Sequence, residues 1–150
     1  LVMLGGATYD PMLERSVRAA AVPDAVLPGA IFGEVYRALQ SNARCYVHAT
    51  EVGGTHPALV EAMGAGNLCL VLDTPENREV AGPDAWYFTD EAGLAMLLRK
   101  VDRLRAADLQ RLRRASAKRA EERYSWDVVA GQYLALIDAE CSGDDKALRP

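Results

Sequence analysis

The chain has 150 residues, of which half are hydrophobic and a quarter are charged, and its formal net charge at pH 7 is −4. This length gives one domain with a substantial core, and the mildly acidic balance argues against a nucleic-acid binder. No apolar run approaches the roughly 18 residues of a membrane-spanning helix, and the widely spaced Cys45, Cys69 and Cys141 favour free thiols in a reducing compartment.

Short apolar runs alternate with helical patterns along the chain. Strands are predicted at 1–4, 25–29, 45–49, 68–73 and 85–89. Helices are predicted at 10–20, 33–40, 55–66, 90–105, 108–123 and 126–139. Apolar strands separated by helices are typical of a parallel sheet that is covered on both faces. The pattern therefore predicts a Rossmann-like α/β domain over 1–140 with a helical tail, and the polar residues 141–150 are expected to be disordered.

The stretch HATEVGGTHPALVEAMGAGN, residues 48–67, contains the main candidate site. Gly53 and Gly54 follow the predicted strand 45–49, and both are expected to take positive φ and to let a ligand approach bare amides. Thr55 or His56 then caps a helix that has Pro57 in its first turn. Because free N–H groups and the helix dipole favour an anion, the stretch predicts a phosphate site at the carboxyl edge of the sheet.

One carboxylate, Glu61, interrupts the apolar part of this helix. Leu59, Val60 and Met63 share a face, and Glu61 falls about 155° from the centre of that face at ~100° per residue. Two interpretations stay open. Glu61 is either a solvated helix residue or an acceptor for the vicinal hydroxyls of a ribose, as in other nucleotide-binding folds.

The same stretch resembles the motif of retaining GT-B glycosyltransferases of the group-1 type (family four), in which two glutamates are separated by seven residues. VEAMGAG matches the second half of that motif. TPENREVAG and RYSWDVVAGQYLALI resemble the loop and the closing Trp helix that follow it in the family. The resemblance extends to about Ile137, and the variant VGGTHPALVEAM is most similar to bacterial rhamnosyltransferase-type members.

The resemblance implies the donor-binding, C-terminal half of a two-domain enzyme. The full enzyme would transfer a sugar from a nucleoside diphosphate sugar to a hydroxyl acceptor with retention, without a metal or cofactor. The sequence opens within a strand-like run, LVML, so we expect the N-terminal acceptor domain and the family's diphosphate-gripping Arg and Lys to precede this piece. The implied partners are that domain and an acceptor glycan or lipid-linked glycan, in the cytoplasm or at the inner membrane face. We expect the piece alone to fold without transferring sugar.

The family's glutamates map unevenly onto this sequence. Its second glutamate maps onto Glu61, which implies contact with the ribose of the donor. The usual spacing places the first at Gly53, and Glu51 replaces it only with a two-residue insertion. Two alternatives therefore remain. Either the amides of Gly53, Gly54 and Thr55 take over the sugar and diphosphate contacts, or Glu51 is the sugar-hydroxyl acceptor and the candidate catalytic residue.

Further candidates are weaker. His56 is either a helix cap or a donor contact, and His48 is expected to be a satisfied residue at the strand end. Glu76 and Glu79 are expected to complement a helix N-terminus, with a role in the cleft as the alternative. Gly5 and Gly6 form a turn or approach the base or diphosphate, and, by analogy with the family, Glu34 and Tyr36 approach the nucleobase.

The region 99–123 holds ten of the seventeen Lys and Arg residues and four acids. It is interpreted as a solvated helix face, with peripheral membrane contact as the alternative. Leu109 and Leu112 are predicted to face the core. Two rival functions remain open, a catalytically inactive nucleotide-binding or interaction module, which the missing first glutamate favours, and half of a sugar-nucleotide epimerase.

Overall fold

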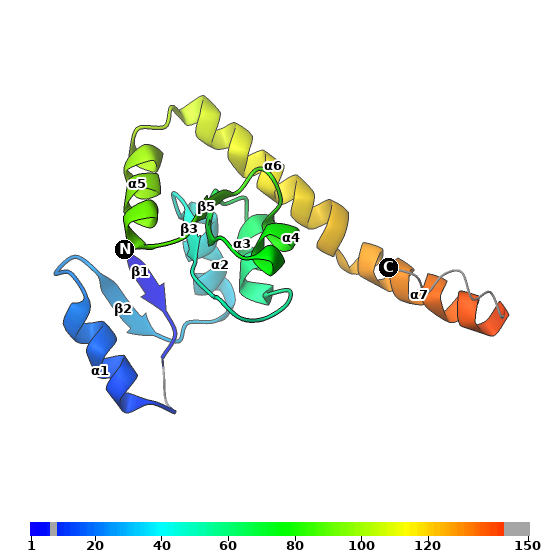
Figure 1. Cartoon of the computed structure of the whole chain (residues 1–150), viewed down its shortest axis with the longest axis horizontal. Helices are drawn as coiled ribbons and strands as arrows, with labels where there is room; N and C mark the ends of the chain where they lie inside the picture. Colours follow the sequence, from blue (N-terminus) through cyan, green and yellow to red (C-terminus); the bar gives the residue numbers. More distant parts are fainter. Residues whose placement is uncertain (7–8, 143–150) are drawn as a thin grey trace. The chain divides into compact units, whose positions relative to one another are not determined.

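The computed structural model describes residues 1–6 and 9–142 (Figure 1). The chain divides into two compact units, Leu1–Leu39 and Gln40 onward, where the sequence pattern predicts a single domain. Strands and helices alternate as predicted, and each strand pairing is parallel. The elements are β1 (Val2–Leu4), α1 (Pro11–Ala20), β2 (Val26–Gly29), α2 (Gly33–Asn42), β3 (Tyr46–His48), α3 (Pro57–Gly64), β4 (Cys69–Leu72), α4 (Pro75–Ala81), β5 (Trp86–Phe88), α5 (Glu91–Asp102), α6 (Ala106–Tyr124) and α7 (Trp126–Ser142).

The five strands form two small sheets, one of order β1-β2 and one of order β3-β4-β5, whereas the sequence predicts a single sheet. The first unit is a βαβ motif in which α1 connects the parallel strands β1 and β2 (Figure 1). Their register shifts between Val2 and Leu4, opposite the part of β2 that contains Pro28. Proline has no N–H to donate, so it interrupts a ladder of hydrogen bonds.

The three-stranded sheet of the second unit is covered by helices on both faces, as the sequence predicts. Successive residues of a strand point to opposite faces. On one face, Cys69 and Val71 of β4 pack with buried residues of α3, α4 and α6, namely Leu59, Met63, Val80, Ala81 and Ala120. On the other face, Leu68 and Leu70 pack with buried residues of β5, α5 and α6, namely Phe88, Val101, Leu109 and Leu112. The core-facing prediction for Leu109 and Leu112 is confirmed.

Helix α4 is not among the helices that the alternating pattern predicts. Thr74 caps it by accepting a hydrogen bond from the N–H of Asn77, and Pro75 begins its first turn. Glu76 lies in that first turn, as expected for an acid that complements the dipole. Glu79 lies beyond the first turn, so the same role does not extend to it.

The C-terminal helix α7 follows α6 after a break at Ser125 (Figure 1). It reaches Ser142, so the start of the predicted disordered tail is helical, and the rest of that tail lies outside the described residues. Its large hydrophobic residues are exposed, with Trp126 at 87% and Tyr133 at 66% of full exposure. Within the described ranges, no helix is both long and apolar enough to cross a membrane.

Candidate functional site

The glycine turn, which we define as residues 50–55, connects the carboxyl end of β3 to the start of α3. Gly53 has φ +142°, a conformation that favours glycine. Gly54 has no positive φ, so that part of the sequence prediction is wrong. A Cβ on Gly53 would lie 2.5 Å from Cε1 of His56, whereas a Cβ on Gly54 would meet nothing within 4 Å. Gly53 is therefore the position where the backbone and the His56 ring require glycine.

Helix α3 begins directly after this turn, with His56 as its N-cap and Pro57 at the first helical position, as predicted. The His56 side chain makes no capping hydrogen bond. In the part of the chain that the structure describes, no acceptor faces the main-chain N–H groups of Gly53, Gly54 or Thr55. These exposed amides and the positive end of the helix dipole can therefore receive an anion.

His48 ends β3 beneath the turn and is only 5% exposed. Its ring lies against His56, with centroids 4.9 Å apart, and it stacks with Tyr46 at 6.3 Å. Its location at a buried strand end is as predicted, but the expectation that it is satisfied is wrong, because the buried Nε2 has no hydrogen-bond partner among the described residues. Burial, with a smaller effect of His56, lowers the pKa of His48, so the imidazole is held neutral.

Glu61 lies on the exposed face of α3, one turn after the helix start. Leu59, Ala62 and Met63 are fully buried on the opposite side, and Val60 is half-buried. The predicted orientation of Glu61, away from the apolar face, is therefore confirmed. Glu51 is also exposed and lies within the glycine turn.

The sequence patterns do not predict a cation at this edge of the sheet. Arg78 of α4 forms an ion pair with Asp73, the residue that follows β4. Its guanidinium also lies over the ring of Tyr87, 4.4 Å from the centroid. The hydrogen bond from Arg78 lowers the pKa of Asp73. Asp73 and Arg78 flank the end of a predicted strand, but nothing in their spacing requires that they form an ion pair.

The weaker candidates Gly5, Gly6, Glu34 and Tyr36 lie in the first unit. Gly5 has φ +110° and donates its N–H to the carbonyl of Gly29, which explains its place in the turn after β1. Glu34 lies in the first turn of α2, with Tyr36 two residues later. These four residues stay sequence-based candidates.

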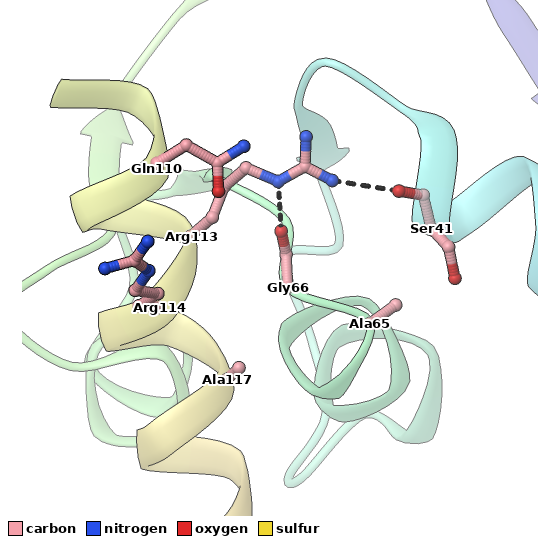
Figure 2. Close-up of a pocket in the computed structure, with 7 residues that line it drawn as sticks. All are labelled: Ser41, Ala65, Gly66, Gln110, Arg113, Arg114 and Ala117. Carbon is pink, nitrogen blue, oxygen red and sulfur yellow. Dashed lines mark hydrogen bonds between the residues drawn. The ribbon is translucent and has the colours of Figure 1, made fainter. Parts of the chain in front are cut away.

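The amino edge of the same sheet holds a second cluster of polar side chains. Arg113 of α6 donates from Nε to the carbonyl of Gly66 and from Nη2 to that of Ser41 at 2.9 Å (Figure 2). Arg119 likewise donates to the carbonyls of Glu79 and Val80 at the end of α4. The basic region is therefore only partly the solvated face that the sequence predicts, because these two cations bind main-chain oxygen.

The cysteines carry no site. All three are free, and Cys69 is buried on the sheet. Burial raises the pKa of Cys69 to about 12, so its thiol stays protonated and is a poor nucleophile. The described ranges contain no cluster of three or more His, Cys, Asp or Glu side chains that could hold a metal ion.

A scan against models of known protein families finds no match for this sequence, and a search of curated proteins finds no similar one.

Proposed function

We propose that this chain is the donor-binding half of a retaining glycosyltransferase and that it binds a nucleoside diphosphate sugar at the carboxyl edge of its three-stranded sheet. The observation that carries the proposal is the glycine turn, where amides without partners among the described residues lead into a helix that has no side-chain cap. Open parallel sheets bind ligands beyond the carboxyl ends of their strands, and helix N-termini favour phosphate.

In this proposal the diphosphate lies against the amides of Gly53, Gly54 and Thr55. Negative charge develops on the diphosphate as the glycosidic bond of the donor breaks. Fixed N–H donors stabilise such charge without having to reorganise, which is the largest single contribution that a protein makes to many reactions. His56, which lies at the helix start and over Gly53, adds a polar ring beside the same phosphates.

Glu61 supplies the ribose contact in this proposal. It is exposed on α3, one turn from the helix start where the diphosphate is placed. A carboxylate accepts two hydrogen bonds from vicinal hydroxyls, which favours a ribonucleotide over other phosphates. The resemblance of VEAMGAG to the glycosyltransferase motif supports the same assignment.

Titration of the chain with UDP, GDP and dTDP tests the proposal. UDP or GDP should bind more tightly than dTDP, whose deoxyribose lacks vicinal hydroxyls, and Glu61→Ala should weaken the binding of that ribonucleotide by ~1–3 kcal/mol, the usual contribution of hydrogen bonds to a charged group. The matched control is Glu140→Ala, which removes an exposed helical glutamate on α7 and should leave the affinity unchanged. No binding by any of the three would contradict a donor site.

A second assay separates a transferase from an inactive binding module. It follows sugar transfer by a longer protein that contains this chain and an acceptor domain. Loss of transfer in Glu51→Gln, with nucleotide binding retained, would identify Glu51 as the sugar-hydroxyl acceptor. Nucleotide binding without any transfer by the unaltered protein would favour the inactive module.

A further inference from the structure

Asn77, a buried asparagine of α4, links two segments at the carboxyl edge of the sheet. It is 2% exposed, and its Nδ2 donates to the carbonyl of Thr50 at 2.9 Å and to that of Leu72 at 3.0 Å. Thr50 begins the glycine turn, and Leu72 ends β4. One side-chain nitrogen therefore connects the glycine turn to the end of the central strand.

The two hydrogen bonds of Asn77 differ in how much they contribute to holding the segment that each one reaches. The carbonyl of Leu72 also accepts from the N–H of Thr74 at 2.9 Å, and the N–H of Asp73 bonds Phe88, so the end of β4 is held without Asn77. In the described part of the chain, the bond from Asn77 to Thr50 is the only hydrogen bond made by residues 50–55. The anchoring of the glycine turn thus depends on Asn77 far more than the anchoring of β4 does.

We propose that Asn77 is a positioning residue that fixes the glycine turn in the conformation that receives the diphosphate, an inference that rests on the proposed function. A turn with a single anchor loses conformational freedom when it closes on a ligand, and an anchor formed in the free protein reduces that cost. Asn77 reaches the ligand only through the backbone that follows Thr50.

The chain offers a matched control at the opposite edge of the sheet. Asn67 is fully buried, and its Nδ2 also donates to two main-chain carbonyls, those of Gln40 and Ala62, each at 3.0 Å. The two asparagines agree in burial, donor group and number of acceptors. They differ in the segment that they hold, since Asn67 bonds α2 and α3 and, among the described residues, makes no hydrogen bond to the glycine turn.

The test compares Asn77→Ala with Asn67→Ala by the backbone 15N order parameters of residues 50–55 and by nucleotide titration. The order parameters of 50–55 should fall towards flexible values, below about 0.6, in Asn77→Ala, and keep the values of the unaltered chain in Asn67→Ala. The affinity for whichever of UDP, GDP and dTDP binds the unaltered chain should fall about tenfold in Asn77→Ala and stay within about twofold in Asn67→Ala, when both are measured on folded protein.

Three results would overturn the inference: unchanged order parameters in Asn77→Ala, an equal fall in both variants, or a fall in Asn77→Ala with unaltered nucleotide affinity. If the unaltered chain binds none of the nucleotides, the proposed function fails, and the order parameters alone decide whether Asn77 holds the turn. Where Asn77→Ala does not fold, Asn77→Ser replaces it. A serine hydroxyl donates one hydrogen, so it can keep at most one of the two bonds.

Discussion

The two edges of the three-stranded sheet are built from similar parts and use them differently. At the amino edge, side chains of α6 and of the segment before β4 reach main-chain carbonyls near the ends of α2 and α3. At the carboxyl edge, a glycine turn whose amides at 53–55 have no partner in the described part of the chain leads into α3, which has no side-chain cap. At the amino edge, carbonyl groups at helix ends accept hydrogen bonds from side chains, whereas at the carboxyl edge the start of α3 has no side-chain cap.

The amino edge is closed mainly by long cationic side chains. Arg113 bonds the segment after α3 and the end of α2, and Arg44 donates to the carbonyls of Val101 and Asp102 at the end of α5. One buried atom stays unpartnered here among the described residues, Oδ1 of Asn67. Its amide nitrogen still makes two hydrogen bonds, so Asn67 is satisfied on its donor side.

At the carboxyl edge, the buried group without a partner lies next to the start of α3. Nε2 of His48 is buried against His56, which covers Gly53. Leaving a buried polar group unpaired costs stability, so such groups in native proteins call for an explanation. The comparison teaches that open donors, a glycine with positive φ and an unpaired imidazole gather at one edge, which is the edge where a parallel sheet binds ligands.

The largest expected effect comes from Arg113→Met, which keeps an unbranched apolar side chain like the aliphatic part of arginine and removes its donors. The free energy of unfolding should fall by about 3 kcal/mol, because two hydrogen bonds from a charged group are lost. Nucleotide affinity of the folded variant should not change. Urea denaturation and nucleotide titration measure the two quantities.

The control for this variant is Arg114→Met, because Arg114 is the next residue of α6 and lines the same surface pocket as Arg113 (Figure 2). No hydrogen bond or ion pair of Arg114 occurs in the described residues, so its replacement should change stability by less than about 0.5 kcal/mol. A tenfold loss of nucleotide affinity in Arg113→Met would show that the amino edge takes part in binding, and the comparison would fail.

A smaller effect is expected from Gly53→Ala at the carboxyl edge. The new Cβ would meet the His56 ring at 2.5 Å, and alanine disfavours φ +142°. Strain of this kind costs about 1–3 kcal/mol, which should appear as weaker nucleotide binding in an isothermal titration. In Gly54→Ala the Cβ enters open space without positive φ, so binding should persist. Equal affinities for the two variants would argue against a ligand at the turn.

The smallest expected effect is a dependence of stability on pH. The folded chain holds His48 neutral to a lower pH than the unfolded chain does, because burial lowers its pKa from the ordinary 6.5. As the pH falls below that value the unfolded state takes up the proton first, so stability is lost on acidification. One proton accounts for at most ~1.4 kcal/mol per pH unit.

Thermal unfolding of the unaltered chain and of His48→Phe between pH 7 and pH 5 measures this dependence. The phenylalanine keeps an aromatic ring against His56 and cannot titrate. The variant should therefore lose less stability on acidification than the unaltered chain. Parallel pH profiles for the two proteins would assign the acid sensitivity to other groups.

Local patterns predicted the parts of this structure that depend on neighbouring residues. The order of strands and helices, the cap at His56 with Pro57 behind it, and the outward side of Glu61 follow from spacing within a few positions. The two core-facing leucines of α6 follow in the same way. In each case the periodicity of one element decides which side chains are buried.

Contacts across long sequence separations could not be predicted in this way. Arg113 bonds carbonyls 47 and 72 residues away, and Asn77 bonds a carbonyl 27 residues away. Nε2 of His48 is unpaired because no hydrogen-bonding group of the described residues lies within reach. The sequence of a single strand or helix cannot specify this. The positive φ predicted for Gly54 is wrong for a related reason. A glycine pair permits positive φ at either position, and tertiary packing selects one.

The guanidinium groups at the amino edge have a consequence for how this fold responds to its medium. Arg44 and Arg113 donate to carbonyl oxygens, which carry no net charge and do not titrate, and arginine itself stays protonated throughout the working range. Added salt screens attraction between opposite charges, but it has much less influence on a short hydrogen bond to a neutral dipole. Acid that protonates carboxylates also leaves these bonds intact. These bonds of the scaffold can therefore persist across changes in ionic strength and proton concentration.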